Sequence, residues 1–313
     1  MNKKFWLPAM MLAVAFTSCS NDDDATPSIK SSVLGVDVTV NEMSRAMVQG
    51  TALKDNDIIG VSVVELDDSN YDDKATGYKN IDYTASTESG KQKWTASADI
   101  MLSGTVGKAV AYFPYDPNAN DYKAIAVDIA DQKDWMYSGE VTNISDANPN
   151  VSFTLNHAQT AVNVKVVRET NYTGAGLVQN LCVKSAGLAK TGTFSAEDGT
   201  WKGLNGADAT IGIAGNFTLT ADNAETTEVV ESEKENPYMI IPASASVVPF
   251  TISANIDGKP YNIEVAMTEA FTPGKVYKIS VKITNVGLVV DSVVIVENWD
   301  EEELTGGDLT PIG

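Results

Sequence analysis

The sequence predicts an all-β protein with two β-sandwich domains in tandem. Apolar residues recur at every second position in many short runs, turn-rich spacers separate these runs, and helical periodicity is nearly absent. Many short strands with turn signals between them are typical of sandwiches. The chain has 313 residues, which is enough for two domains of ordinary size.

The first expected strand covers residues 34–40, LGVDVTV. Its leucine and three valines fall on one face, while Gly35, Asp37 and Thr39 fall on the other. Because successive side chains of a strand point to opposite faces, this pattern predicts a half-buried strand. The same reasoning predicts further strands over 58–65, 107–113 and 122–129.

Alternation continues through the second half of the chain. It predicts strands over 157–167, 176–185 and 276–283. The segment 249–267 is expected to form a hairpin, because Asp257 and Gly258 supply the signal of a two-residue turn. These strands are expected to build the second sandwich.

A polar stretch divides the two halves. Residues 143–150, NISDANPN, lack apolar periodicity and are rich in asparagine, aspartate and proline, which suits a linker. We therefore expect one sandwich over 46–150 and a second over 151–287. A C-terminal segment, 288–313, follows the second sandwich.

The chain begins with the pattern of a lipoprotein signal. Two lysines precede the apolar run FWLPAMMLAVAF, and TSC follows it. A membrane span needs about 20 apolar residues, so residues 1–18 are expected to be a signal peptide. Cys19 stands where such signals place the acylated cysteine; the alternative is an ordinary secretory signal with an incidental cysteine. The polar, acidic residues after Cys19 cannot bury apolar surface, so residues 19–45 begin as a solvated tether.

Charge and the scarcity of reactive side chains exclude several classes of function. The formal net charge of −20 repels nucleic acid and anionic headgroups. Cys182 is the only cysteine besides Cys19, so an acylated chain can form neither an internal disulfide nor a cysteine zinc site. His157 is the only histidine, and we expect it to be structural. No enzymatic activity, metal or cofactor is expected.

Arg45 stands in the stretch SRAM, and the chain has only one other arginine, Arg168. Positive charge elsewhere comes from lysine. Taken alone, an arginine in a polar loop is usually just solvated. Its place between the candidate lipid anchor and the first sandwich opens a second interpretation.

A series of motifs resembles the fimbrillins of Bacteroidetes, the subunits of type V pili. Each motif is weakly specific, and their order carries the resemblance. The motifs are the signal ending at Cys19, SRA (44–46), DNDIIGV (55–61), VGKAVAYFPYD (106–116), SFTLNHAQTAVNVKV (152–166), FTPGKVYKISVKI (271–283) and VVIVENW (293–299).

This resemblance implies transthyretin-like sandwich domains, export as a lipoprotein and maturation by an arginine-specific protease. Carried to this sequence, the cleaved bond is Arg45–Ala46. Lipid on Cys19 would hold the precursor at the outer membrane, and cleavage would release residues 46–313 to a cell-surface pilus. The implied partners are other fimbrillin subunits, including tip and anchor proteins.

The strand at 34–40 lies on the discarded side of Arg45. If it completes the first sandwich, its removal leaves an apolar groove and unpaired backbone groups, which invite a strand from another chain. The C-terminal segment is the expected donor, and head-to-tail insertion of this kind grows a filament. The expected donor residues are Leu288, Val290, Val294, Val296 and Trp299.

Two alternatives stay open from the sequence. Within the same family, the chain is an anchor that keeps its lipid or a tip adhesin, although Arg45 and the C-terminal segment favour a polymerising subunit. In another class, it is a surface lipoprotein that binds glycans on exposed aromatic platforms. The candidate platform residues are Trp94, Trp135, Trp201 and Trp299, although tryptophans beside strands are more often core.

Overall fold

The computed structural model confirms the all-β class. It describes residues 31–41, 53–73, 77–206, 210–214, 216–219, 238–243 and 246–296. Over these ranges the chain forms strands, two short 3₁₀ turns and no α-helix. The 3₁₀ turns are η2 (Tyr71–Asp73) and η3 (Ile129–Asp131). Within the same ranges no helix has the length and apolarity to cross a membrane.

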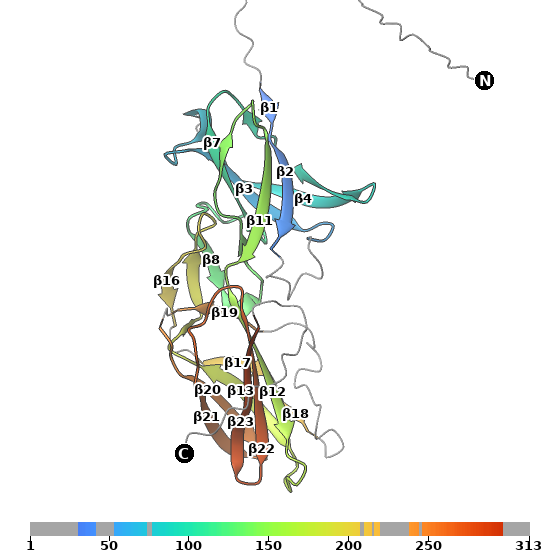
Figure 1. The fold of residues 1–313 in the computed structure, drawn as a ribbon, viewed down its shortest axis with the longest axis vertical. Helices are drawn as coiled ribbons and strands as arrows, with labels where there is room; N and C mark the ends of the chain where they lie inside the picture. Colours follow the sequence, from blue (N-terminus) through green and yellow to red (C-terminus); the bar gives the residue numbers. More distant parts are fainter. Residues whose placement is uncertain are drawn as a thin grey trace, which may run out of the picture.

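The first half of the chain is built round one large sheet that curls over its own core. In order across the sheet, its strands are β2 (Gly35–Val40), β11 (Asn150–His157), β9 (Met136–Tyr137), β7 (Gly107–Phe113), β3 (Ile58–Glu65), β4 (Tyr78–Glu88) and β5 (Lys91–Ala96), with β10 (Val141–Ile144) beside β7. The outermost strands meet in one core, because Val38 of β2 and Trp94 of β5 belong to the buried cluster that contains Phe153 of β11. A small sheet of β1 (Ser32–Val33) and β6 (Met101–Leu102) lies at the end of this half (Figure 1).

The second half is a sandwich of two sheets. One sheet runs β14 (Leu188–Ala189), β19 (Tyr238–Pro242), β12 (Thr160–Arg168), β22 (Val276–Thr284) and β23 (Gly287–Val296). The other runs β17 (Thr210–Ala214), β13 (Leu177–Lys184), β20 (Phe250–Ile256) and β21 (Lys259–Val265), with β18 (Phe217–Thr218) beside β13. Val164 of β12 and Ile252 of β20 are buried in one cluster, so the two sheets share a core.

The predicted hairpin at the end of β20 is confirmed. Ile256 lies opposite Lys259, and the two residues between them, Asp257 and Gly258, have φ of 49° and 79°. Positive φ at both central positions defines the type I′ turn, whose twist matches that of the flanking strands.

A third, small sheet joins the halves. Strand β8 (Ile125–Asp128) comes from the sequence before residue 150, yet it pairs with β15 (Thr191–Phe194), which in turn pairs with β16 (Trp201–Asn205). Figure 1 shows these strands between the upper and lower parts of an elongated molecule. Ile125 and Val127 are buried in the same cluster as Phe194. Strand pairing and core packing therefore both continue from one half into the other.

The predicted strands form close to their expected bounds. Residues 58–65 and 107–113 are β3 and β7. The strand expected over 122–129 is shorter at both ends. It begins only at Ile125, because a turn precedes it in which the Ala124 N–H donates to the Asp121 carbonyl (3.0 Å). It ends at Asp128, whose carboxylate accepts a hydrogen bond from the Ala130 N–H (2.9 Å) and begins η3. An aspartate that caps a turn ends a strand that apolar alternation alone would extend.

The polar stretch 143–150 contains the end of β10, the turn after it and the first residue of β11. The Asn148 N–H donates to the Ser145 carbonyl across it (3.0 Å). A division of the chain at residue 150 stays a prediction. The strand pairing does not follow this division closely: β11, which begins at residue 150, belongs to the sheet of the first half, and β8 belongs to a sheet that reaches into the second half.

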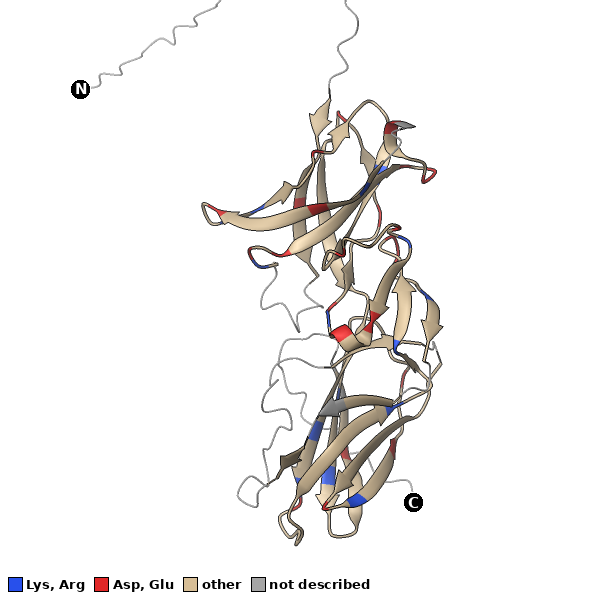
Figure 2. Ribbon diagram, turned by 180° about the vertical axis from the view of Figure 1, so that it is seen from behind, with Lys and Arg blue, Asp and Glu red and all other residues tan. Residues whose placement is uncertain are grey.

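Acidic residues are spread over both halves (Figure 2), and five charged groups gather where the halves meet. The side chain of Lys108 on β7 is only 7 % exposed, and its ammonium pairs with Asp68 (2.6 Å), Glu140 and Glu197 (3.2 Å). Lys123 pairs with Asp68 (2.7 Å) and Glu197 (3.0 Å). Because Glu197 follows β15, this cluster links the first sheet to the small joining sheet by charge.

The Lys108 ammonium is the cation that pairs with the three carboxylates of this cluster. The carboxylates of Asp68, Glu140 and Glu197 bring ligand atoms within 4.8 Å of one another, and the Lys108 ammonium contacts all three. Hydrogen bonds from Lys108 and Lys123 lower the pKa of the Asp68 carboxyl. Burial alone would lower the pKa of Lys108, but its hydrogen bonds to the three carboxylates outweigh burial and raise it.

We expect Lys108→Met to reduce the free energy of unfolding by about 2 kcal/mol. The change leaves three carboxylates without their shared cation, and their partial exposure keeps the loss below the roughly 3–5 kcal/mol of a fully buried pair. Chemical denaturation measures the difference. Lys93→Met is the matched control, because Lys93 and Glu88 form an exposed pair whose loss should change stability by less than about 0.5 kcal/mol. Equal effects of the two substitutions would contradict the role given to Lys108.

The pH dependence of the same variant gives a second readout. Pairing lowers the pKa of Asp68 in the folded protein, so its contribution is present above the unfolded value of about 3.9 and is lost as the pH falls through the folded value. Between about pH 5 and about pH 2, wild type should therefore lose more stability than Lys108→Met.

Candidate functional site

Residues 32–40, called the leading strand below, run along the edge of the first half. They comprise β1 and β2. The Leu34 N–H donates to the Ile100 carbonyl, and just past the strand the Asn41 N–H donates to the Leu155 carbonyl (2.9 Å each). Backbone hydrogen bonds thus fix the leading strand at both ends.

Strand β2 pairs with β11 in the parallel direction. Gly35 lies opposite Asn150 at one end of the ladder, and Val40 lies opposite Leu155 at the other. β2 is the terminal strand of the sheet order, so β11 is its one sheet neighbour among the described strands. A strand in this position can leave without separating any other pair of strands in the sheet.

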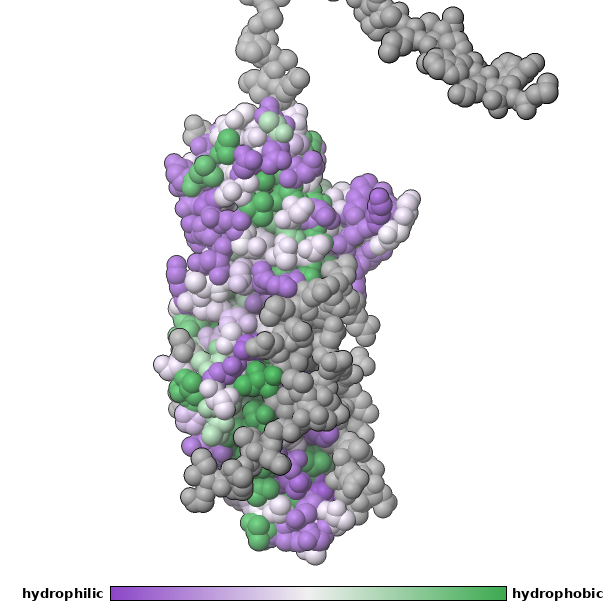
Figure 3. All heavy atoms as spheres, in the orientation of Figure 1, coloured by the Kyte–Doolittle hydropathy of each residue, from purple (hydrophilic) through white to green (hydrophobic). Residues whose placement is uncertain are grey.

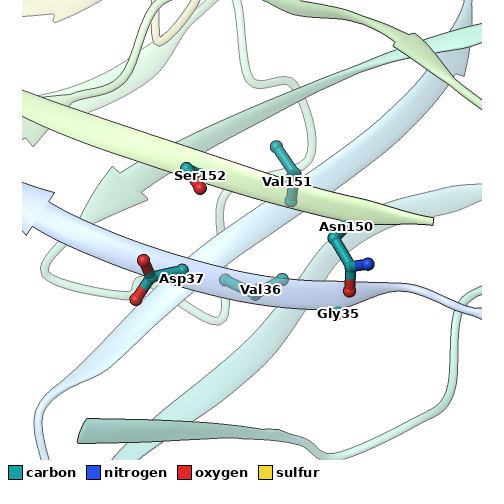
Figure 4. A pocket seen from close by; sticks show the side chains of 6 residues that line it. All are labelled: Gly35, Val36, Asp37, Asn150, Val151 and Ser152. Carbon is teal, nitrogen blue, oxygen red and sulfur yellow. The ribbon is translucent and has the colours of Figure 1, made fainter. Parts of the chain in front are cut away.

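A glycine permits close approach where this seam begins. A Cβ atom on Gly35 would lie 2.3 Å from Oδ1 of Asn150, so a larger residue would require the Asn150 side chain to move. Figure 4 shows the Asn150 side chain beside Gly35, with Val36 and Asp37 further along β2. The shallow depression that these residues line is the outer surface of the seam, and its one charged side chain, Asp37, is exposed.

The apolar face predicted for 34–40 is buried. Leu34, Val38 and Val40 are each 3 % exposed, and Val36 packs against the same cluster. Burying a side chain of this size contributes about 1.5–3 kcal/mol. From outside, hydrophobic residues on the face in Figure 3 form small areas among hydrophilic ones. The leading strand therefore completes the core of the first half, as the sequence argument requires.

The residues predicted to carry lipid and to be cleaved lie outside the described part of the chain. Cys19 falls in 1–30, and Arg45 and Ala46 fall in 42–52. The order of the described strands still places them: β1 and β2 precede Arg45, and β3 and all later strands follow it. The Arg45–Ala46 bond therefore separates the leading strand, in sequence, from all other described strands.

The predicted donor segment begins as an edge strand of its own sheet. β23 pairs antiparallel with β22, and an irregularity in their register shifts which residues of β23 face inward. Leu288 and Val290 pack against the core before this shift, and Val293 and Ile295 do so after it. Residues 288–296 are thus bound within the second half of this chain.

The remaining donor residues are placed only in part. Val294 lies opposite Lys278 and Val296 lies opposite Val276 in the backbone register. Trp299 lies outside the described residues. A donor role for these residues stays a prediction.

The single histidine has the structural setting expected of it. His157 and Asp134 are both buried, and Nδ1 of the imidazole lies 2.5 Å from Oδ1 of the carboxylate. Oδ2 of the same carboxylate is buried and has no hydrogen-bond partner among the described residues. Because both side chains are buried, the pair offers no access to a substrate.

The tryptophans of the glycan-binding alternative lie mainly in the core. Trp94 and Trp135 are buried. Trp201 is half-buried, and its indole N–H donates to the Ala158 carbonyl (2.7 Å). These three rings form no exposed platform, and Trp299 is outside the described residues.

Fold and leading strand together define an all-β protein whose first core includes a strand at the edge of its sheet. The chain belongs to the fimbrillin-like family, whose model matches residues 44–299. This is a family of structural fimbrial proteins and not of enzymes. The match begins one residue before Arg45 and leaves the leading strand out. A search of curated proteins finds no match.

Solved structures of similar fold include two from Bacteroides species. A candidate cell adhesion protein of Bacteroides ovatus is 18% identical, with a TM-score of 0.58 over 88% of this chain and 100% of its own. One of Bacteroides uniformis is 18% identical, with a TM-score of 0.57 over 86% of this chain and 98% of its own. At this identity the likeness establishes the fold.

Sequence reasoning found the leading strand but not the strand that holds it. β11 begins at Asn150, inside the stretch read as a linker, whereas a strand was expected only from residue 157. Val151, Phe153 and Leu155 alternate in NVSFTLNH and are the signal that predicts β11. Its parallel pairing with β2 joins segments far apart in sequence, which local patterns do not encode.

We expect Val38→Ala to reduce the free energy of unfolding of the uncleaved chain by about 2 kcal/mol, because the substitution leaves a cavity in the first core. Thr39→Ala, at the exposed neighbouring position, should change it by less than about 0.5 kcal/mol. Thermal and denaturant unfolding measure both variants. Similar small effects from the two would show that the leading strand adds little to the core.

Proposed function

We propose that this chain is the precursor of a structural pilus subunit, exported as a lipoprotein through Cys19 and matured by cleavage of the Arg45–Ala46 bond. One observation carries the proposal. The leading strand is built into the first core, yet it lies before residue 44, where the part shared with the family begins. A segment that the fold uses and the family match omits suits a removable propeptide.

Cleavage changes how strongly the leading strand is held, although it breaks no contact. Before cleavage the strand belongs to the same chain as its groove, so it competes at high effective concentration. After cleavage only noncovalent contacts retain it. Its departure would strip residues 150–155 of β11 of their partner on that side and expose the cluster that Leu34, Val38 and Val40 cover.

An exposed strand edge beside an apolar groove is a template for strand addition. We propose that the C-terminal segment of another subunit fills it, with Leu288, Val290, Val294, Val296 and Trp299 as the candidate contact residues. Because residues 288–296 pair with β22, a donor that includes them must first leave its own sheet. A donor confined to the residues after 296 avoids that requirement.

Repeated insertion would produce a filament of this subunit at the cell surface, released from the outer membrane lipid by the cut. Its partners would be further fimbrillin subunits, tip and anchor proteins, and the arginine-specific protease. The two Bacteroides structures of similar fold are of candidate cell adhesion proteins, which supports a role in adhesion.

Arg45→Ala should yield a folded precursor that keeps its lipid and does not polymerise, because the leading strand stays tethered in its groove. Ladders of subunits on gels run without boiling measure polymerisation, and a palmitate analogue reports the lipid on Cys19. Arg45→Lys is the matched control, since it keeps the charge and should block an arginine-specific enzyme as alanine does. Normal ladders in Arg45→Ala would remove Arg45 from the mechanism.

Deletions from Leu288 and from Asp300 should distinguish the two possible donors. Both should abolish filament growth if the donor lies after 299, whereas only the deletion from Leu288 should do so if β23 is donated. The gain from burying even a few valines or leucines, at about 25 cal/mol per Å², amounts to several kcal/mol, so loss of the donor should stop growth.

Fold is the control for these deletions, because removing β23 takes an edge strand from the second half. Circular dichroism and protease resistance of each purified variant establish that it is folded. A folded, cleaved protein lacking residues 288–313 that still forms long filaments would contradict the donor assignment.

A further inference from the structure

Arg168, the second arginine of the chain, has its guanidinium held by backbone carbonyls. Nη1 donates to the carbonyls of Leu219 (2.8 Å) and Ala175 (3.4 Å). Nη2 donates to the carbonyls of Tyr172 and Gly174 (3.0 Å each). The guanidinium carbon lies 5.2 Å from the centre of the Tyr172 ring. We call these four carbonyls and this ring the carbonyl clamp.

Asp257 fixes the loop that supplies most of the clamp. Its carboxylate accepts hydrogen bonds from the Tyr172 hydroxyl (2.6 Å), the Gly176 N–H (3.1 Å) and the Leu177 N–H (2.8 Å). Burial, together with the bond to Asp257, raises the pKa of Tyr172 to about 12, so its hydroxyl remains a donor at neutral pH. Gly176 has φ of 77°, and a Cβ there would lie 2.5 Å from the Leu219 oxygen.

Backbone pairing protects the bond after Arg168 on one side. Arg168 lies opposite Ile283 of β22, and the Glu169 N–H donates to the Ile283 carbonyl (2.9 Å). On the other side of β12, the pairing with β19 covers only Thr160–Val162. Among the described strands that edge is open beside Arg168, and an open edge is what an enzyme needs to bind a peptide as an added strand.

The side chain supplies the protection that the backbone lacks. A protease that selects arginine must draw the guanidinium into a pocket opposite a carboxylate. The guanidinium of Arg168 cannot occupy such a pocket while four carbonyls hold it. Cleavage therefore requires the loop from residue 169 to 176 to open first.

We propose that the carbonyl clamp withholds Arg168 from arginine-specific proteases, so that maturation yields one product, residues 46–313, from a chain with two arginines. The proposal rests on the proposed function for its biological meaning, because it specifies why cleavage is confined to Arg45. A cut after Arg168 would break the chain at the end of β12, between β12 and the later strands of the second half. The shielding itself is a property of the fold and can be measured with any purified arginine-specific endopeptidase.

The test digests the full chain, carrying Cys19→Ala to prevent acylation, and follows both cuts by intact mass. We expect a cut after Arg45 and, after Arg168, a rate at least about 100-fold below that of an unstructured peptide, because cleavage there needs local opening. Synthetic peptides spanning 40–50 and 163–173 provide the unstructured references. They should be cut at similar rates.

Gly176→Ala should accelerate the cut after Arg168 about tenfold or more, because the new methyl group displaces the Leu219 carbonyl and strains a left-handed residue. Gly90→Ala is the matched control: its φ is also 77°, and a Cβ there meets no atom within 4 Å. Tyr172→Ala opens the clamp independently, by removing the ring and the bond to Asp257. Circular dichroism and thermal unfolding verify that each variant is folded.

Two results would overturn the proposal. One is cleavage of folded wild type after Arg168 at the rate of the peptide. The other is an unchanged rate after Arg168 in both clamp variants. An intact Arg45 in a chain whose Arg168 is protected would support the clamp and contradict the proposed maturation, so the two ideas fail separately.

Discussion

The pairing of β2 with β11 is the contact on which the first half depends. It combines a ladder of main-chain hydrogen bonds with burial of Leu34, Val38 and Val40 in the central cluster. Each of these two contributions is of ordinary strength. Together they are what any strand contributes to a sandwich. Their importance comes from their place in the chain, because one segment, between Val40 and Ile58, connects the leading strand to the strands that follow it. Under the proposed cleavage of the Arg45–Ala46 bond, this strand would be held to the core by noncovalent contacts alone.

Local patterns predicted the strands whose residues alternate, and little of what those strands do together. Residues 34–40 and 276–283 are recognisable because an apolar residue stands at every second position. β4 and β5 were missed because their sequences, YKNIDYTASTE and KQKWTA, are mainly polar and acquire their few buried residues only from the curl of the sheet. The linker prediction at 143–150 stays a prediction, since a polar turn inside a domain has the composition of a polar turn between domains. Pairing that connects distant segments, such as β2 with β11 or β8 with β15, is set by the whole fold and leaves no local signal.

Lys108 and the half-buried Arg168 are accommodated by different chemistry. Lys108 gathers carboxylates, which suits a compact ammonium and an acidic chain with carboxylates to spare. Arg168 gathers carbonyls, which suits a planar guanidinium with several donors in fixed directions. The sequence singled out both arginines for their rarity but offered no sign that the second would be enclosed by main-chain oxygens from a loop and a distant strand end. The role of Lys108 was not predicted, because a single lysine in an alternating strand has the pattern of a solvated residue.

The small sheet between the halves has a mechanical consequence. The chain crosses this junction out to β8, back to β9 and again from β11 to β12, and β8 is hydrogen-bonded to β15 while it is there. Tandem domains joined by one flexible linker bend at the linker, and each domain moves independently of the other. Here a stretching load applied at the two ends must be carried through strand pairs, a shared core and the Lys108 cluster. Under tension the two halves should therefore behave as one stiff body. A fibre assembled from this chain would bend chiefly at the contacts between molecules.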